Sequence, residues 1–358
     1  MNLKKFFAAS LALCLLFSMT ACRDQGGSSP DPTPSPSDSG QVENNQPGGD
    51  TSEPSPEVTE TIRFTVLSGP TGVGASKLMS DVDAGQAAHN YEYTICAVND
   101  EVTSMLLNGS TDIAAIASNV ALNLYNKTDG GVTVIALGTL GVLHILEANG
   151  GTSIQSVSDL AGKTILAPGQ GANPEYILRY ILSENGLDPD SDVSIQFYSD
   201  ASEITAKLLS GEADCAMLPV PAATAAIAKS GGSVRAALDL TQEWNALDNG
   251  SQLIMTAVVA RTEFVQQHPE AVTAFLSDYA ASIDFVNENV EEAAELVAGY
   301  GFAPSSAIAA KAIPQCNLVC ITGADMQPAI DGYYSVLYSA NPKSVGGSLP
   351  DDAFYYVP

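Results

Sequence analysis

The sequence has 358 residues, of which 41 are acidic and 14 are basic, so its formal net charge is −27 at pH 7. A chain of this length can form two compact lobes. Basic patches that would follow a phosphate backbone are absent from it, which argues strongly against nucleic acid as a partner. Such acidity is typical of a solvated surface and says little about a ligand.

The first 21 residues have the layout of a secretory signal. Two lysines precede a 14-residue apolar run at 6–19, which is too short to span a bilayer stably, and small residues follow. Cys22 comes directly after Thr20 and Ala21 and resembles the lipobox cysteine of bacterial lipoproteins, although an ordinary signal peptide is the alternative. We expect Cys22 to be lipidated and to hold the protein on the extracytoplasmic face of the cell membrane.

A tether is predicted after Cys22, over residues 22–60. Residues 23–60 contain 7 Pro, 5 Gly and 7 Ser, with almost nothing apolar to bury. Such a segment cannot offset its ordering entropy, so we expect it to be disordered or extended. The remaining residues, 61–358, contain no second apolar run of 18 residues, and we expect no further membrane span.

A glycine-rich stretch at 69–76 follows a predicted buried strand at 62–67. It is one residue away from the phosphate-binding pattern G-x-x-x-x-G-K-[ST]. Ala75 stands where that pattern requires lysine, and Lys77 lies about 200° further round a helix of 3.6 residues per turn. We therefore interpret the stretch as a glycine turn that directs backbone donors at a ligand, and not as a nucleotide loop.

The body of the chain contains an internal repeat with an offset of 102 residues. Residues 101–117 and 203–219 share seven of seventeen residues, and at the same offset Gly69 falls on Gly171. Each copy predicts a strand, a glycine turn, a helix, a strand, a helix that ends in L-x-G-x-x-D, and another strand. The repeat predicts an α/β protein with two Rossmann-like lobes of related topology.

Two apolar, β-rich segments, 133–149 and 251–262, are interpreted as crossover strands between the lobes. They predict a lobe I of residues 61–143 plus 257–358, and a lobe II of residues 144–256. Two crossing strands form a hinge and leave a cleft between the lobes.

Candidate ligand-binding residues lie at the carboxyl ends of the predicted strands. In open α/β sheets, ligands bind there because helix N-termini expose backbone N–H groups and the positive end of the helix dipole. Turn and N-cap roles are the alternative for many of these residues. The predicted ligand-binding residues are Ser68, Gly69, Pro70, Thr71, Gly72, Asn99, Asp100, Ser118, Asn119, Thr139, Gly169, Gln170, Gly171, Ala172, Asn173, Pro219 and Val220.

Catalytic patterns are not found. The three histidines lie in unlike contexts, and no G-x-S-x-G motif occurs. We predict no enzyme activity, no cofactor and no metal site. His144 and Trp244 are interpreted as core residues, with ligand contact as the alternative. Cys316 and Cys320 are four residues apart, which allows a small disulfide, but no further metal ligands accompany them.

Several stretches resemble solute-binding lipoproteins of ABC importers, in the nitrate, sulfonate, taurine and thiamine-precursor group (the NMT1/thiamine-biosynthesis-like branch). The resemblance covers essentially all of 61–358 and implies the type II periplasmic-binding-protein fold. It implies a monomer that closes on a small polar or anionic solute (a sulfonate, a carboxylate or a pyrimidine-type vitamin precursor) and docks on a permease powered by a cytoplasmic ATPase. The stretches are GPTGVGASKLM (69–79), DLAGKTILAPGQGANPEYILRYILSENGLDP (159–189), LLSGEADCAMLP (208–219) and ANPKSVGGSLPDDAFYY (340–356).

One departure from the resemblance concerns the ligand. Many relatives read LPEP where this chain has LPVP at 218–221, so Val220 lacks a carboxylate that a relative would use. Two alternatives stay open: a sensory lipoprotein that presents its ligand to a receptor kinase, and an extracellular enzyme. A thiamine-pyrimidine synthase shares the fold but carries a cysteine-rich motif that this chain lacks.

Overall fold

The computed structural model describes residues 60–358. The predicted signal segment 1–21, the predicted lipidation site Cys22 and all of the predicted tether except Glu60 lie outside the described residues, so these remain predictions. Within residues 60–358, no helix combines the length and the hydrophobicity that a membrane crossing needs.

The same order of elements occurs twice, as the repeat predicts. The first copy runs β1 (Ile62–Leu67), α1 (Pro70–Asp83), β2 (Tyr91–Cys96), α2 (Asn99–Asn108) and β3 (Ile113–Ala117). Helix α2 and strand β3 begin and end 102 residues before α5 (Ala201–Ser210) and β8 (Cys215–Pro219) of the second copy. The second copy runs β6 (Thr164–Pro168), α4 (Asn173–Glu184), β7 (Ser194–Tyr198), α5 (Ala201–Ser210) and β8 (Cys215–Pro219).

The glycine of the L-x-G-x-x-D motif ends a helix in both copies. Gly109 follows α2 with φ 75°, and Gly211 follows α5 with φ 76°. Both residues adopt the left-handed conformation, which glycine reaches without a Cβ penalty. The chain therefore turns directly from each helix into the following buried strand.

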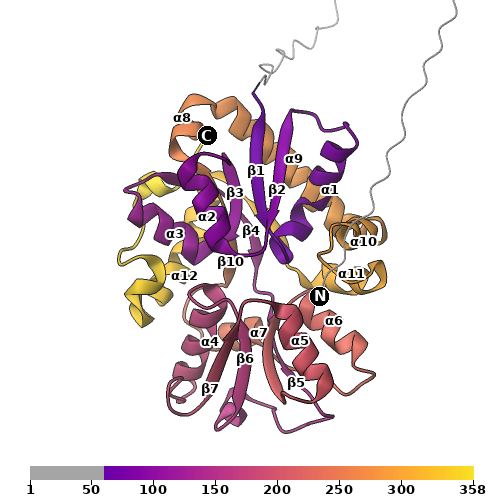
Figure 1. The fold of residues 1–358 in the computed structure, drawn as a ribbon. Helices are drawn as coiled ribbons and strands as arrows, with labels where there is room; N and C mark the ends of the chain where they lie inside the picture. Colours follow the sequence, from indigo (N-terminus) through magenta and orange to yellow (C-terminus); the bar gives the residue numbers. More distant parts are fainter. Residues whose placement is uncertain (1–59) are drawn as a thin grey trace, which may run out of the picture. The chain divides into compact units, whose positions relative to one another are not determined.

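The two copies build two sheets of the same design (Figure 1). In the first sheet, β1 pairs in parallel with β2 and β3, and β10 (Ile254–Arg261) runs antiparallel between β3 and β4 (Val132–Leu140). Strand β11 (Leu318–Ile321) adds the edge next to β4, so the order is β11-β4-β10-β3-β1-β2.

The second sheet has the order β7-β6-β8-β5-β9. Its β6 pairs in parallel with β7 and β8, and β5 (Leu143–Glu147) runs antiparallel between β8 and β9 (Arg235–Asp239). Strands β5 and β10 thus occupy equivalent places in their sheets. The fold is α/β with two mixed sheets, as predicted.

The chain passes between the two sheets twice. It leaves the first sheet after β4 and enters the second with β5, and it returns with β10 after α7 (Leu240–Ala246). The predicted boundary 143/144 falls one residue inside β5, and the predicted boundary 256/257 falls inside β10. The sequence shows only a continuous apolar run there, whereas the pairing of β10 begins at Ile254 with β4 and at Thr256 with β3.

Further helices cover the sheets and extend towards the C-terminus. Pro269 occupies the first turn of α9 (Pro269–Glu288), where its missing N–H costs no hydrogen bond. The remaining elements are α3 (Ser118–Lys127), α6 (Ala222–Lys229), α8 (Thr262–Gln267), α9 (Pro269–Glu288), α10 (Val290–Gly299), α11 (Ser306–Ala312) and α12 (Met326–Ala340), with the short 3₁₀ segments η1 (Val157–Leu160), η2 (Ile313–Gln315), η3 (Gly323–Asp325), η4 (Pro342–Val345) and η5 (Asp352–Phe354).

One hydrophobic core is shared by the two lobes. It joins Leu122 of α3 and Ile254 of β10 to Ile165 of β6 and Ile177 of α4, with Tyr333 of α12 among its members. A second cluster lies in the first lobe except for Val220, and a third lies within the second lobe. Residues 60–358 fall within a single compact unit, and the shared core explains why two separate sheets form one body.

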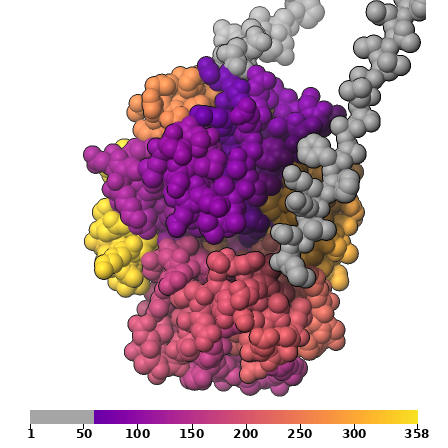
Figure 2. Space-filling model, in the orientation of Figure 1, coloured from indigo at the N-terminus to yellow at the C-terminus, as the bar shows by residue number. Residues whose placement is uncertain are grey.

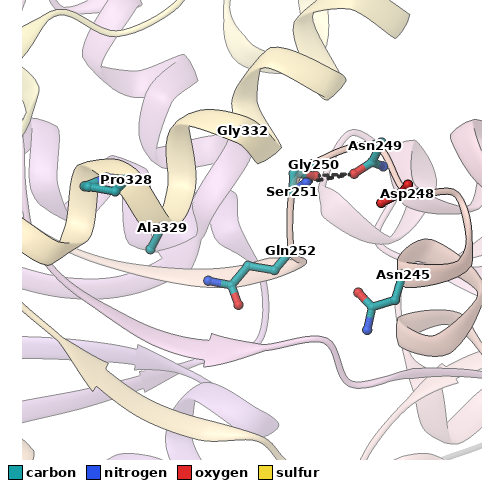
Figure 3. Close-up of a pocket in the computed structure, with 9 residues that line it drawn as sticks. All are labelled: Asn245, Asp248, Asn249, Gly250, Ser251, Gln252, Pro328, Ala329 and Gly332. Carbon is teal, nitrogen blue, oxygen red and sulfur yellow. Dashed lines mark hydrogen bonds between the residues drawn. The ribbon is translucent and has the colours of Figure 1, made fainter.

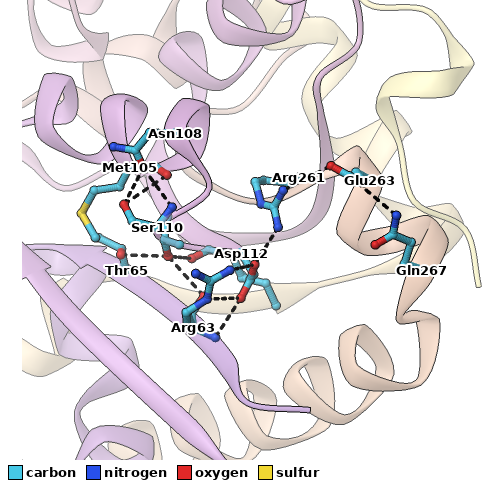
Figure 4. A network of polar contacts seen from close by, with 11 residues as sticks. Arg63, Thr65, Met105, Asn108, Ser110, Asp112, Arg261, Glu263 and Gln267 are labelled. Carbon is cyan, nitrogen blue, oxygen red and sulfur yellow. Dashed lines mark hydrogen bonds and ion pairs between the residues drawn. The ribbon is translucent and has the colours of Figure 1, made fainter.

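A buried carboxylate links two strands at the end of the first sheet that faces away from the second lobe. Asp112 precedes β3, and its side chain is 2 % exposed. Arg63 Nε lies 2.8 Å from its Oδ2, and Arg261 Nη2 lies 2.9 Å from its Oδ1 (Figure 4). Two guanidinium groups thus satisfy one buried charge, which ties the start of β1 to the end of β10.

Candidate ligand-binding cleft

A cleft of about 1140 Å³ lies between the two lobes. Its walls come from the starts of α1 and α2 in the first copy and of α4 and α5 in the second, with α6 and residues 301–304 completing them. Figure 2 shows the two lobes meeting along a line across the viewed face. Because the parallel strands of both sheets end at this boundary, the helix starts that follow them converge on the same cleft.

Most of the predicted site residues line this cleft, and six do not. The six that lie elsewhere are Thr71, Gly72, Ser118, Asn119, Thr139 and Asn173. Those that line it are Ser68, Gly69, Pro70, Asn99, Asp100, Gly169, Gln170, Gly171, Ala172, Pro219 and Val220.

The start of α1 is suited to an electronegative ligand group. Gly69 precedes the helix with φ 105°, a conformation that favours glycine, and Pro70 opens the first turn. No acidic residue occurs in that turn, and no side chain caps it. The positive end of the helix dipole is therefore not neutralised locally, and it faces the cleft beside Ser68.

The start of α4 is partly occupied by its own side chains. The Gly171 N–H donates to Glu175 Oε2 at 2.8 Å. Arg179 in turn binds Glu175 at 2.9 Å and Asp190 at 2.8 Å. A side chain of α4 thus occupies one backbone donor of this loop, whereas no side chain caps α1, although the repeat predicts equal loops.

An aromatic and aliphatic wall was not predicted. Phe197, Tyr198 and Leu209 line the cleft from the second lobe, and Phe302 lines it from the segment after α10. A Cβ added at Gly72 would overlap the ring of Phe302, so this glycine lets the ring pack directly on the first turn of α1. No local signal marks Phe302, because its partner lies 230 residues earlier in the chain.

Few charged groups face the cleft. Asp100 and Asp200 contribute carboxylates, and Asp200 also caps α5 by accepting the Ser202 N–H at 2.7 Å. Among the described residues that line the cleft, Lys229 has the only basic side chain, and it lies exposed at the end of α6. An anionic group bound deep in the cleft would thus depend on backbone N–H groups and hydroxyls.

Three of the predicted site residues belong instead to a buried polar junction between the lobes. Ser118, Asn119 and Asn173 are all fully buried. Asn173 Nδ2 donates to Ser118 Oγ at 3.0 Å and to the Met255 carbonyl at 2.7 Å. The sequence places these residues correctly at helix starts, but their side chains turn towards the other lobe and away from the cleft.

The other residues outside the cleft have structural surroundings. Thr71 Oγ1 donates to the Leu67 carbonyl at 2.6 Å, and Thr139 is buried on β4. His144 is half-buried on β5, where burial lowers the pKa of its imidazole. Trp244 is fully buried and packs between Tyr180 and Tyr333. None of these side chains reaches the cleft.

The cysteines of residues 60–358 carry free thiols. Burial raises the pKa of Cys316 to about 12 and that of Cys320 to about 11. The disulfide that their spacing allows is not present. Within the same residues, no group of three or more His, Cys, Asp and Glu side chains is placed to hold a metal ion.

A second, smaller cavity of about 330 Å³ lies on the hinge, between residues 245–252 and α12 (Figure 3). Its lining comes from the second crossing and from Pro328, Ala329 and Gly332. The predicted ligand loops do not reach it, so the larger cleft is the candidate site.

Similarity to known proteins agrees with this geometry. The sequence matches no curated protein. An ABC transporter structure from Parabacteroides distasonis has a TM-score of 0.68 at 23 % identity, over 83 % of this chain and 98 % of that chain. The periplasmic aliphatic sulphonate binding protein SsuA from Escherichia coli has a TM-score of 0.64 at 17 % identity, over 80 % and 96 %. The periplasmic nitrate-binding protein NrtA from Synechocystis PCC 6803 has a TM-score of 0.55 at 15 % identity, over 82 % and 83 %.

These structures share the two-lobed fold with this chain, which confirms the predicted type II periplasmic-binding-protein architecture. A family model described as NMT1/THI5 like matches residues 89–293, which is more than half of the sequence and includes the whole second copy of the repeat and the first copy from β2 onwards. The chain therefore belongs to the NMT1/THI5-like family.

Proposed function

We propose that the protein is the extracytoplasmic solute-binding component of an ABC importer. It captures a small polar or anionic solute between its lobes and delivers it to a permease served by a cytoplasmic ATPase. The observation that carries this proposal is the cleft of about 1140 Å³, lined by equivalent loops of both copies. Family membership and the fold shared with sulphonate- and nitrate-binding proteins support it.

The lining favours an organic solute with one electronegative end. The uncapped start of α1 suits a sulfonate, a carboxylate or a ring nitrogen, because each accepts hydrogen bonds from backbone N–H groups. Phe197, Tyr198 and Phe302 offer an apolar surface to the rest of the molecule. Rotation about the two crossings would close the lobes and exclude water from the bound solute.

Binding without turnover agrees with the lining. The described residues around the cleft include no histidine and no cysteine, and His144 lies outside it. Asp200 is engaged as a helix cap. We therefore propose a binding protein and not an enzyme.

A solute screen tests the proposal directly. The full chain, solubilised in a mild detergent, is heated with taurine, an aliphatic sulfonate, nitrate or an aminopyrimidine. A solute present at about 100 times its dissociation constant adds about 2.7 kcal/mol to the free energy of unfolding. A clear rise in Tm with one class identifies the solute, whereas no rise with any class contradicts the proposal.

A matched pair of charge changes locates the binding. Gln170 lines the cleft, and Gln86 is exposed outside it. We expect Gln170→Glu to weaken binding of an anionic solute, because the new carboxylate repels it, and Gln86→Glu to leave binding unchanged. Equal effects of the two changes would place the solute elsewhere.

The anchor is proposed at Cys22, on the extracytoplasmic face of the cell membrane. Several acyl chains hold a protein at a bilayer much more firmly than one. We expect Cys22→Ser to release the protein from the membrane fraction and to reduce uptake of the stabilising solute by cells. Retention of the variant in the membrane fraction would contradict lipidation at this residue.

A further inference from the structure

Three consecutive residues of α12 contact three different parts of the molecule. Gly332 contacts the second crossing, Tyr333 contacts the second lobe, and Tyr334 contacts the first lobe. Both tyrosines are fully buried. This stretch of α12 is therefore the place where the hinge and both lobes meet.

Gly332 lets the crossing approach the helix closely. A Cβ at this position would lie 3.0 Å from Ser251 Cβ and 3.3 Å from the Gly250 carbonyl oxygen. Figure 3 shows Gly332 beside Gly250 and Ser251. Ser251 Oγ also accepts the Trp244 Nε1–H at 3.2 Å, so the crossing connects α12 to the core of the second lobe.

Tyr333 completes the hydrogen bonding of Asn173 at the start of α4. Its hydroxyl donates to Asn173 Oδ1 at 2.9 Å, and the Asn119 N–H donates to the same oxygen at 3.3 Å. The amide nitrogen of Asn173 donates to Ser118 Oγ and to the Met255 carbonyl. All four hydrogen-bonding positions of this side chain are thus occupied by partners outside the second lobe.

Tyr334 and Asn119 extend the same network to the cleft. Tyr334 donates to the Ser118 carbonyl at 2.9 Å. Asn119 Nδ2 donates to the Ser344 carbonyl at 3.0 Å and to the Gly171 carbonyl at 3.3 Å. Gly171 itself lines the cleft. A continuous chain of hydrogen bonds therefore leads from α12 to a ligand loop.

Aromatic packing surrounds this network. Ring centroids lie 4.9 Å apart between Tyr180 and Trp244, 5.6 Å between Trp244 and Tyr333, and 6.2 Å between Tyr334 and Phe354. In such a water-poor setting a hydrogen-bonding group that loses its partner is costly. Because breaking these buried hydrogen bonds is costly, we expect the two lobes to stay in contact at this junction when they rotate.

We propose that Tyr333 is a positioning residue for the ligand-binding cleft. Acting through Asn173, it sets the position of the loop 169–172 relative to the first lobe, and α12 serves as the fixed side of the hinge. The proposal rests on the proposed function, since it assumes that this loop contacts the solute. Its test measures amide exchange in this loop without solute. The positioning role of Tyr333 can therefore be contradicted independently of the solute screen.

Amide hydrogen exchange of the full chain provides the test. Tyr333→Phe removes the hydroxyl but keeps the ring, and Tyr338→Phe is the control, because Tyr338 lies on the same helix with a half-exposed ring outside this network. Loss of one net hydrogen bond of about 1 kcal/mol predicts about fivefold faster exchange at Gly171, Ala172 and Asn119. Peptides from β6 and β7 should keep the wild-type rate, and Tyr338→Phe should match the wild type throughout.

Two results would overturn the proposal. Exchange at Gly171 and Ala172 could stay at the wild-type rate in Tyr333→Phe, which would show that the hydroxyl does not position the loop. Exchange could instead rise equally across the whole second lobe, which would show a general loss of stability.

A second variant keeps the test decisive if Tyr333→Phe does not fold. Gly332→Ala displaces the crossing from α12, and Gly299→Ala is its control, because a Cβ there meets no atom within 4 Å. Trp244 is the only tryptophan of the sequence and packs on Tyr333, so its fluorescence reports the displacement. We expect Gly332→Ala to change this emission and to speed exchange at Gly171. A changed emission with unchanged exchange at Gly171 would contradict the proposal.

Discussion

The starts of α1 and α4 are equivalent by the 102-residue repeat, but they face different surroundings. Thr71 and Asn173 occupy the same place in the two copies. Thr71 bonds its own strand, and the first turn of α1 lies against Phe302 beside the cleft. Asn173 crosses to the other lobe and binds Tyr333. The duplication thus preserves the backbone conformation of the two helix starts, whereas their contacts with later segments of the chain determine the role of each copy.

The aspartates of the two L-x-G-x-x-D motifs differ in the same way. Asp112 is buried between Arg63 and Arg261. Its equivalent, Asp214, is exposed and accepts one side-chain hydrogen bond, from Asn149 at 2.5 Å. The glycine of the motif forms the turn in both copies. The carboxylate of the motif forms buried ion pairs only in the first copy, where Arg63 of β1 and Arg261 of β10 contact it.

The largest effect is expected from removing the buried aspartate. Asp112→Ala leaves two arginines without their shared partner and should lower the free energy of unfolding by about 3 kcal/mol. Asp214→Ala, at the equivalent exposed position, should change it by less than about 0.5 kcal/mol. Urea unfolding of both variants measures the difference. Similar losses in the two would show that the copies use this residue alike.

The same contrast predicts a dependence on pH. Burial by itself would raise the pKa of Asp112, but hydrogen bonds from Arg63 and Arg261 outweigh it and hold the pKa below its ordinary value. A carboxyl of this kind stabilises the fold above its unfolded pKa of about 4, and the contribution is lost as the pH falls through the lower folded value. The stability gap between wild type and Asp112→Asn should therefore narrow in acid. A gap that stays constant from pH 7 to strongly acidic pH would contradict this.

An intermediate effect on stability is expected at the contact between Gly72 and Phe302, which distinguishes the start of α1 from that of α4. Gly72→Ala forces the ring of Phe302 away from α1, and overpacking of this kind costs about 1–3 kcal/mol. Gly299→Ala adds a methyl group in open space and should be neutral or slightly stabilising. Thermal unfolding of the two variants compares them. A neutral Gly72→Ala would show that Phe302 is not held against this helix.

The smallest expected effect is a difference in solute affinity between changes at two leucines that are equivalent by the repeat. Leu107 is 64 % exposed, while Leu209 is 37 % exposed and lines the cleft. We expect Leu209→Ser to weaken binding of the solute found in the screen by about 1 kcal/mol, since it removes part of the apolar wall. Leu107→Ser should leave affinity unchanged. Isothermal titration of both variants decides whether the two copies contribute differently to binding.

Much of the fold could be predicted from local patterns. The repeat of Gly69 on Gly171, and of Glu101 on Glu203, marks equivalent turns and helices, because backbone conformation and hydrophobic periodicity act over a few residues. Eleven predicted residues, including Ser68, Gly169 and Pro219, line the cleft because they follow strands that end at one boundary. Local patterns do not reveal which side of the cleft is apolar, since Phe302 is far from these loops in the chain.

The sequence by itself determined the two-lobed α/β design, the equivalence of the copies and the loops from which a cleft is built. Each of these depends on interactions within a short stretch, such as the left-handed turns at Gly109 and Gly211. Tertiary structure alone decided that Asn173 faces Tyr333, that Asp112 is buried while Asp214 is not, and that Phe302 covers α1. Those outcomes depend on which distant side chains meet in space, and packing between segments far apart in the chain selects the partners.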